Sequence, residues 1–404
     1  MWNSLTKILT TPSLRVATIT LFCLGFTYAS TIPYQSIIGI DQLGMSNWHY
    51  SILMIAMAVT GMIGSFVMGY FSDRTDDRKK SILITLGVGA VGFGAFSIFP
   101  SLWSFIFCLV LISPISGSTY GQLFAVIRSQ TAEFGSRDAA SVNSVVRSIY
   151  AASWILVPGL VGLYIATRKN VSDSYSIAAA AFAFCFLIYL VFGKSVKNNT
   201  VGQGSAWAGF KTALNLVASR QIFLRVLALA LIATPQPTNG ALLPLFITHL
   251  PGGTTADVGL LAGLVAGLEI PFMLLAGYFN RSKPTWIIII VAGLTHATYL
   301  FGLGFVTATW QIYLLSIINA AGAAVMLSLH LSYLQDLMPD RPGLGTSLLS
   351  IGSLLNKGFG AVVFASAGTV IGFSGAAWFG VTVTVIGCVL LYLLDRRRGS
   401  HAKS

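Results

Sequence analysis

Residues 175–193 read YSIAAAAFAFCFLIYLVFG, an unbroken apolar run without a charged side chain. A run of about 20 such residues can cross the roughly 30 Å hydrocarbon core of a bilayer as an α-helix. Eleven further runs of this kind occur along the chain. The twelve expected spans are 15–38, 48–71, 80–100, 102–127, 138–166, 175–193, 222–248, 256–279, 285–306, 309–335, 343–370 and 372–394.

The bulk composition agrees with this pattern. The chain is 55% hydrophobic and 9% charged, with a mean hydropathy of +0.79. These values are typical of an all-α integral membrane protein and leave almost nothing for a soluble domain. The first apolar run lacks a convincing small-residue cleavage site and is long enough to span, so we expect no cleaved signal peptide.

The net charge of +12 is distributed very unevenly along the chain. When the N-terminus is placed in the cytoplasm, nearly all Lys and Arg residues fall on the inner side, and Arg168 and Lys169 fall outside. Cytoplasmic loops of membrane proteins carry this excess. We therefore expect both termini in the cytoplasm and assign the basic residues to topology and anionic-lipid contact rather than to nucleic acid.

A polar segment at 194–221 divides six spans from six spans. The expected organisation is a six-helix half at 1–193, a cytoplasmic linker at 194–221, and a second six-helix half at 222–404 with a short basic tail. The tripeptide Gly-Tyr-Phe ends the second span at 69–71 and recurs at 277–279 at the end of the eighth. Such echoes indicate duplicated halves, and parallel halves of this kind place a binding site between them near the bilayer midplane.

The sequence contains little that would indicate an enzyme. No HExxH, GxSxG or nucleotide-binding loop is present, and a sensor would need a soluble output domain. A membrane-embedded enzyme or sensor is therefore the remote alternative to a transporter, and we expect no cofactor and no metal. The cysteines are expected to be free buried thiols: Cys23, Cys108, Cys185 and Cys388.

The segment after the second span reads GYFSDRTDDRKK over residues 69–80. It resembles the signature loop of the major facilitator superfamily, although the second Gly of that pattern is missing and two extra aspartates lengthen the loop. The resemblance implies that Asp73 lies against the N-terminus of the eleventh span, where the helix dipole favours a carboxylate, with Arg137 as its partner. We expect Asp73, Arg74 and Arg137 to gate the cytoplasmic side.

Three further motifs resemble the sugar efflux transporter family within that superfamily. They are Gln122–Ala125, Gly267–Pro271 and Gln335–Pro339. The resemblance implies a secondary transporter of the bacterial inner membrane that exports small sugars or glycosides by alternating access, driven by proton antiport. We expect it to be a monomer. A multidrug or other metabolite antiporter on the same scaffold is the alternative, and a cavity dominated by aromatic side chains would favour it.

Three ionisable residues lie inside the expected spans: Arg147, Glu269 and Lys357. A charge at the bilayer centre costs about 2.5–3.5 kcal/mol on insertion scales, so such residues usually face a cavity and take part in function. We expect all three to serve proton coupling, with Glu269 as the proton or sugar-hydroxyl site and Arg147 as its modulator. A structural ion pair is the other interpretation.

Sugar hydroxyls need hydrogen-bond partners, and the fold implied by the resemblance lines its cavity with spans 1, 4, 7 and 10. The seventh span is interrupted by Pro235 and Pro237, and broken helices at membrane depth are tolerated where they line a cavity or are buried in protein. Single polar residues in spans can also serve as interhelical contacts. The expected sugar-binding residues are Tyr28, Gln122, Asn143, Asn239, Glu269 and Asn319.

Overall fold

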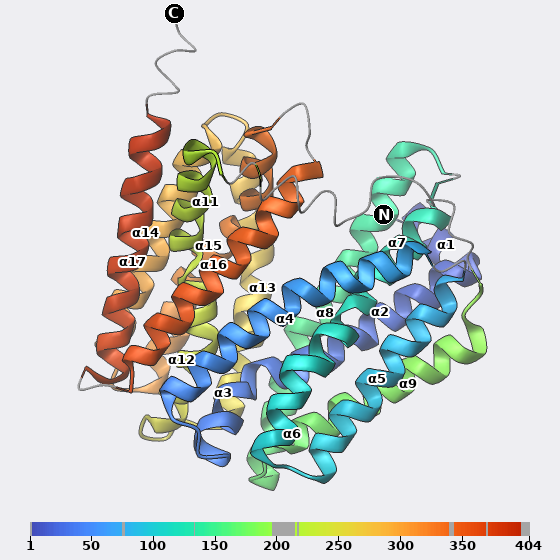
Figure 1. The fold of residues 1–404 in the computed structure, drawn as a ribbon, viewed down its shortest axis with the longest axis horizontal. Coiled ribbons are helices and arrows are strands. Elements are labelled where there is room, and N and C mark those ends of the chain that lie inside the picture. Colours follow the sequence, from blue (N-terminus) through green and yellow to red (C-terminus); the bar gives the residue numbers. More distant parts are fainter. Residues whose placement is uncertain are drawn as a thin grey trace, which may run out of the picture. The chain divides into compact units, whose positions relative to one another are not determined.

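The computed structural model describes residues 2–74, 77–132, 134–195, 215, 218–338, 343–368 and 371–396. Within these ranges, 12 helices are long and apolar enough to cross a membrane. Figure 1 shows the helices in sequence order from blue to red. The predicted fold class, an all-α protein with twelve spans, is confirmed, and most boundaries agree within a few residues.

The chain forms two compact units. Residues 1–43 and 60–205 make up the first unit, and residues 44–59 and 206–404 make up the second. The predicted linker at 194–221 lies mostly outside the described residues, so its role stays a prediction.

The first unit contains the spans that precede the linker and part of α4. Its elements are α1 (Trp2–Thr10), α2 (Pro12–Thr31), η1 (Ile32–Tyr34), α3 (Gln35–Ile37), η2 (Ile38–Gln42), α4 (Asn47–Arg74), α5 (Arg78–Ile98), α6 (Leu102–Phe107), η3 (Cys108–Ile112), α7 (Ser113–Gln130), α8 (Ser136–Arg168) and α9 (Asp173–Phe192). Helix α2 packs against α8 and α9, and α5 packs against α9 and α7. In Figure 1, α5 and α9 run side by side.

An aromatic cluster fills the contact between α5 and α9. Phe93 stacks on Tyr175 with ring centroids 5.4 Å apart, and Phe96 meets the same ring edge-on at 4.7 Å. Gly89 allows this approach, because a Cβ at that position would lie 2.7 Å from the ring of Phe182. Small residues let membrane helices pack closely in this way.

The second unit contains the remaining spans. Its helices are α11 (Arg220–Ala233), α12 (Pro235–His249), α13 (Thr255–Phe279), α14 (Thr285–Leu303), α15 (Thr309–Asp336), α16 (Gly343–Ser366) and α17 (Gly372–Asp395). Helix α15 packs against both α13 and α14, and α17 packs against α14 and α11. The first part of α4 also belongs here, where Tyr50 meets Phe364 with ring centroids 5.5 Å apart.

The seventh span is divided as its two prolines predict. Helix α11 ends at Ala233 and α12 begins at Pro235, with Thr234 between them. Proline has no backbone N–H to donate, so the helical ladder cannot run through this point. The amide of Thr234 instead donates to the Leu231 carbonyl at 3.3 Å. Gly360 of α16 lies close by, since a Cβ there would be 2.6 Å from Pro237 Cγ.

A buried ion pair joins the ends of three helices in the second unit. Arg225 Nε on α11 donates to Asp395 Oδ1 on α17 at 2.8 Å. The hydroxyl of Tyr333, near the end of α15, donates to Asp395 Oδ2 at 2.6 Å. Both carboxylate oxygens of Asp395 are therefore satisfied, which a buried charge requires.

Candidate functional site

The predicted site residues of the first unit lie on α2, α7 and α8. Tyr28 on α2 is half-buried, and its hydroxyl lies 3.1 Å from Ser116 Oγ on α7. Its ring meets Phe182 edge-on at 5.9 Å. These contacts fix the tyrosine between two neighbouring helices and hold its hydroxyl in one place.

Gln122 is held at one end of its amide group. It lies on α7 and is 5% exposed, and its Nε2 donates to Ser118 Oγ at 3.2 Å. Its Oε1 is buried and accepts no hydrogen bond within the part of the chain that the structure describes. A buried acceptor without a donor costs about 1–3 kcal/mol, so this oxygen is a strong candidate for a ligand contact.

Asn143 has a partner on its own helix. Its Nδ2 donates to the Ala139 carbonyl one turn earlier on α8, at 2.9 Å. This bond ties the side chain to its own backbone, as short polar side chains often do in helices. Asn143 therefore has a hydrogen bond within its own helix, and its role in substrate binding stays a prediction.

Arg147 lies over an aromatic surface that the sequence analysis did not single out. Its guanidinium carbon is 5.3 Å from the centre of the Phe124 ring, a cation–π distance. Tyr120 adjoins this ring at 4.8 Å and meets Tyr150 at 4.9 Å. The i, i+4 spacing of Tyr120 and Phe124 on α7 was the signal that could have revealed this cluster.

The second unit holds two of the predicted ionisable residues, Glu269 and Lys357. Glu269 is half-buried on α13, and Lys357 on α16 is exposed. Among the described residues of their own unit, neither side chain has a hydrogen bond or an ion pair. An ionisable group inside a span without a partner is a functional candidate by default.

The two asparagines of the second unit are both bonded to α14. Asn239 on α12 accepts a hydrogen bond from the Tyr299 hydroxyl at its Oδ1, at 2.6 Å. Asn319 on α15 has its Oδ1 3.2 Å from His296 Nε2. Neither His296 nor Tyr299 was among the predicted site residues, although a histidine within an apolar span was a visible signal.

The predicted gating residues fall at the margin of the described structure. Asp73 and Arg74 end α4, and Arg137 lies in the first turn of α8, but their side chains lie outside the described part. One of the extra aspartates of this loop has a visible role. Asp77 caps α5, where its side chain accepts a hydrogen bond from the Lys79 amide at 2.9 Å.

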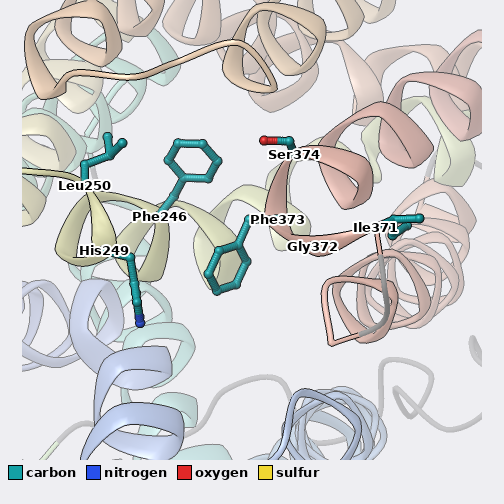
Figure 2. Close-up of a pocket in the computed structure, with 7 residues that line it drawn as sticks. All are labelled: Phe246, His249, Leu250, Ile371, Gly372, Phe373 and Ser374. Atoms are coloured by element: carbon teal, nitrogen blue, oxygen red, sulfur yellow. The ribbon is translucent and has the colours of Figure 1, made fainter.

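A pocket also opens where α12 ends and α17 begins (Figure 2). His249 in its wall donates its Nδ1 proton to the Leu245 carbonyl at 2.7 Å, so that ring is held by its own helix. The pocket contains none of the predicted site residues. Its lining is Phe246, His249, Leu250, Ile371, Gly372, Phe373 and Ser374.

Comparison with known families decides the class of this molecule. The sequence profile of the Major Facilitator Superfamily matches residues 17–309 and 238–404. The chain belongs to the major facilitator superfamily. As a member of this superfamily, the protein is a multi-pass membrane transporter and not an enzyme.

The predicted resemblance to sugar efflux transporters is also confirmed. Sugar efflux transporter A of Dickeya chrysanthemi is 28% identical over 81% of this chain and 82% of its own. Sugar efflux transporter A of Escherichia coli K12 is 25% identical over 92% of this chain and 93% of its own. The chain thus matches these relatives along most of their length.

Solved structures agree on the fold. The nucleoside transporter NupG superimposes with a TM-score of 0.78, at 14% identity, over 95% of this chain and 99% of that one. A POT family transporter in complex with 5-aminolevulinic acid gives a TM-score of 0.72 at 13% identity, over 95% of this chain and 96% of that one. At such low identity these matches show the major facilitator fold alone.

Proposed function

We propose that this protein exports small sugars or glycosides across a bacterial inner membrane by alternating access, as a proton antiporter. The observation that carries the proposal is the similarity to sugar efflux transporters, at 25–28% identity over most of the chain. The chemistry of the described residues supports it. Amide, hydroxyl and aromatic groups inside the spans are the groups that sugar hydroxyls and C–H faces require.

The proposed sugar contacts come from both units. In the first unit, Gln122 offers its unsatisfied Oε1 to a sugar hydroxyl, and the rings of Tyr120, Phe124 and Tyr150 offer flat apolar surface. A buried acceptor that regains a donor on binding contributes to both affinity and specificity. The full set we propose is Tyr28, Gln122, Asn143, Asn239, Glu269 and Asn319.

We assign proton coupling to Glu269, with Arg147 as its modulator and Lys357 as a further coupling residue. A carboxylate inside a span can load and release a proton, and chains of such groups form the proton relays of transporters. Glu269 has no partner among the described residues of the second unit, which supports this role, because a carboxylate locked in a structural pair could not exchange protons freely. Asp73, Arg74 and Arg137 are proposed as the cytoplasmic gate.

The proposed topology places both termini and the 194–221 linker in the cytoplasm, in a monomeric protein whose basic loops contact anionic lipids. The uneven distribution of Lys and Arg supports it. Single cysteines placed in 196–206 and after Arg398 should react with an impermeant thiol reagent only from the cytoplasmic side. Labelling of either position in intact cells would contradict this orientation.

An antiporter of multiple drugs is the second candidate. The observation in its favour is the aromatic cluster of Tyr120, Phe124 and Tyr150, because apolar organic molecules bind such surfaces. The polar amides of the second unit argue against it, since burying them against a fully apolar ligand would leave their hydrogen bonds unmade.

Transport in inverted membrane vesicles tests the two candidates together. Vesicles that contain the protein should accumulate labelled sugar when a proton gradient, acidic inside, is imposed, and should lose that accumulation when an uncoupler is added. Vesicles from cells without the protein are the control. Accumulation of a lipophilic cation with no uptake of any sugar would reject the sugar proposal in favour of the drug antiporter.

A further inference from the structure

Helix α14 carries two large buried side chains with polar groups. His296 is 1% exposed and Tyr299 is fully buried. Their spacing of three residues places them on the same face of the helix, about one turn apart. Hydrocarbon offers no hydrogen-bond partners, so polar groups at this depth need partners from the protein.

Both partners are asparagines that we propose as sugar ligands. The Tyr299 hydroxyl donates to Asn239 Oδ1 at 2.6 Å, and His296 Nε2 lies 3.2 Å from Asn319 Oδ1. An amide oxygen can only accept, so the proton of the neutral imidazole is on Nε2. The same donor-to-oxygen arrangement occurs twice, from one helix to two different helices.

These two hydrogen bonds determine whether the oxygen or the nitrogen of each asparagine amide remains available to bind a substrate. With both oxygens occupied, Asn239 and Asn319 keep their Nδ2 groups, for which no acceptor is found among the described residues. An amide nitrogen can only donate. In the first unit the situation is reversed, because Gln122 uses its nitrogen on Ser118 and keeps its oxygen.

We infer that His296 and Tyr299 are positioning residues that hold Asn239 and Asn319 with their amide nitrogens directed to the substrate. The inference rests on the proposed function and narrows its substrate class. The second unit would select ligands with oxygen acceptors, such as the hydroxyl or ring oxygens of a neutral sugar. A protonated amine has no acceptor to offer, and the desolvated amide donors would be left unpaired.

Removal of one hydroxyl tests the tyrosine. Tyr299→Phe frees the Asn239 amide to rotate, and we expect the KM for the sugar to rise about three- to tenfold, the equivalent of one neutral hydrogen bond. Vmax and the melting temperature should stay near wild type. Tyr313→Phe is the matched control, because that hydroxyl also donates to a side chain of the second unit, Asp257 Oδ1 at 3.0 Å, and should leave the KM unchanged.

A double mutant separates positioning from packing. If Tyr299 acts only through Asn239, then Tyr299→Phe should have no further effect on the KM in an Asn239→Ala background. Additive increases in KM would overturn the positioning role. So would a Tyr299→Phe protein with a lower melting temperature and Vmax but an unchanged KM, since that pattern belongs to a structural contact.

A conservative replacement tests the histidine. His296→Gln carries an amide nitrogen that can donate in place of Nε2, and its KM should stay within about twofold of wild type, whereas His296→Leu should raise the KM about three- to tenfold. Equal KM values for both variants and wild type would overturn the inference and leave the proposed function standing. Wild-type vesicles that accumulate no sugar would instead reject the proposed function, and the positioning role with it.

Discussion

The two units of this transporter share a helical design but satisfy their polar side chains differently. In the first unit the charge of Arg147 rests on an aromatic ring, and Tyr28 contacts a serine hydroxyl. In the second unit the asparagines are bonded by a histidine and a tyrosine, while Glu269 and Lys357 have no hydrogen bond or ion pair among the residues of that unit that the structure describes. The described polar groups of the first unit thus lie beside aromatic rings and a serine, and those of the second unit include amides and two charges.

The units also differ in their ion pairs. Lys7 and Asp138 of the first unit form a pair whose side chains are 35% and 55% exposed. Arg225 and Asp395 of the second unit are 11% and 3% exposed. Burial removes water from both charges of the second pair. Loss of either partner should therefore lower the stability of the fold more than loss of a partner from the exposed pair. The comparison therefore predicts unequal responses to matched substitutions.

The largest effect is expected at Glu269. Glu269→Gln should abolish export driven by a pH gradient, while sugar exchange between the two sides without a gradient should continue, because the amide has a similar shape and can form hydrogen bonds but cannot take up or release a proton. Uptake and exchange in inverted vesicles measure the two activities. Asp173→Asn is the matched control, since that half-buried carboxylate at the start of α9 accepts a hydrogen bond from Asn170 and should leave export unchanged.

A different outcome would favour the structural interpretation of Glu269. In that case Glu269→Gln and Arg147→Gln would each reduce the amount of folded protein, and the double mutant would recover it. Export by Glu269→Gln that still follows an imposed pH gradient at the wild-type rate would end the coupling role.

The buried ion pair should give the next largest effect. Arg225→Gln leaves the Asp395 carboxylate without its charged partner, and loss of one partner of a buried pair costs about 3–5 kcal/mol. The melting temperature of the purified protein should fall clearly. Lys7→Gln at the exposed pair of the first unit should cost about 1 kcal/mol or less. Equal changes in melting temperature for Arg225→Gln and Lys7→Gln would show that burial does not determine how much an ion pair contributes to stability.

Helix packing in the second unit gives a smaller effect. A Cβ on Gly387 of α17 would lie 2.8 Å from the Ile232 amide nitrogen and 2.9 Å from the Ala228 carbonyl oxygen, and neither backbone atom can move away easily. Gly387→Ala should therefore cost about 1–3 kcal/mol. Gly61→Ala on α4, where no atom lies within 4 Å, is the control and should leave the melting temperature unchanged.

The smallest effect is expected at the aromatic surface of the first unit. Phe124→Leu removes the ring beneath Arg147 but keeps an apolar side chain of similar length. A cation–π contact contributes about 0.5–1 kcal/mol at exposed sites, so the KM for the sugar should rise about two- to fivefold with little change in proton coupling. If Phe124→Leu lost as much proton coupling as Glu269→Gln, the main coupling role would belong to Arg147 instead.

The fold followed from the sequence because membrane spans obey a strong local rule. Each helix must satisfy its own backbone within about 20 apolar residues, and hydropathy alone locates such runs. The break at Thr234 was predictable for a similar reason, since Pro235 and Pro237 lack the required N–H groups. The assignment of residues 44–59 to the second unit was not, because it depends on contacts such as Tyr50 with Phe364.

The site was only partly predictable. Charged residues in apolar runs are easy to find in a sequence, as for Glu269, Arg147 and Lys357. His296 lies in a run of the same kind but was not among the predicted site residues. The pairing of His296 with Asn319 and of Tyr299 with Asn239 joins residues 23 and 60 positions apart in the chain. No periodicity within a single helix encodes such a pairing, because it arises only when α14 packs against its neighbours.

The ion pair between Arg225 and Asp395 can form only late in the synthesis of the chain. Its partners are 170 residues apart in the chain, on α11 and α17. During synthesis Arg225 must enter the membrane long before Asp395 exists, and a lone arginine near a helix end can reach the lipid headgroups while it waits. This ion pair can therefore form only after the final helix has left the ribosome, and a chain that ends before α17 keeps Arg225 without Asp395.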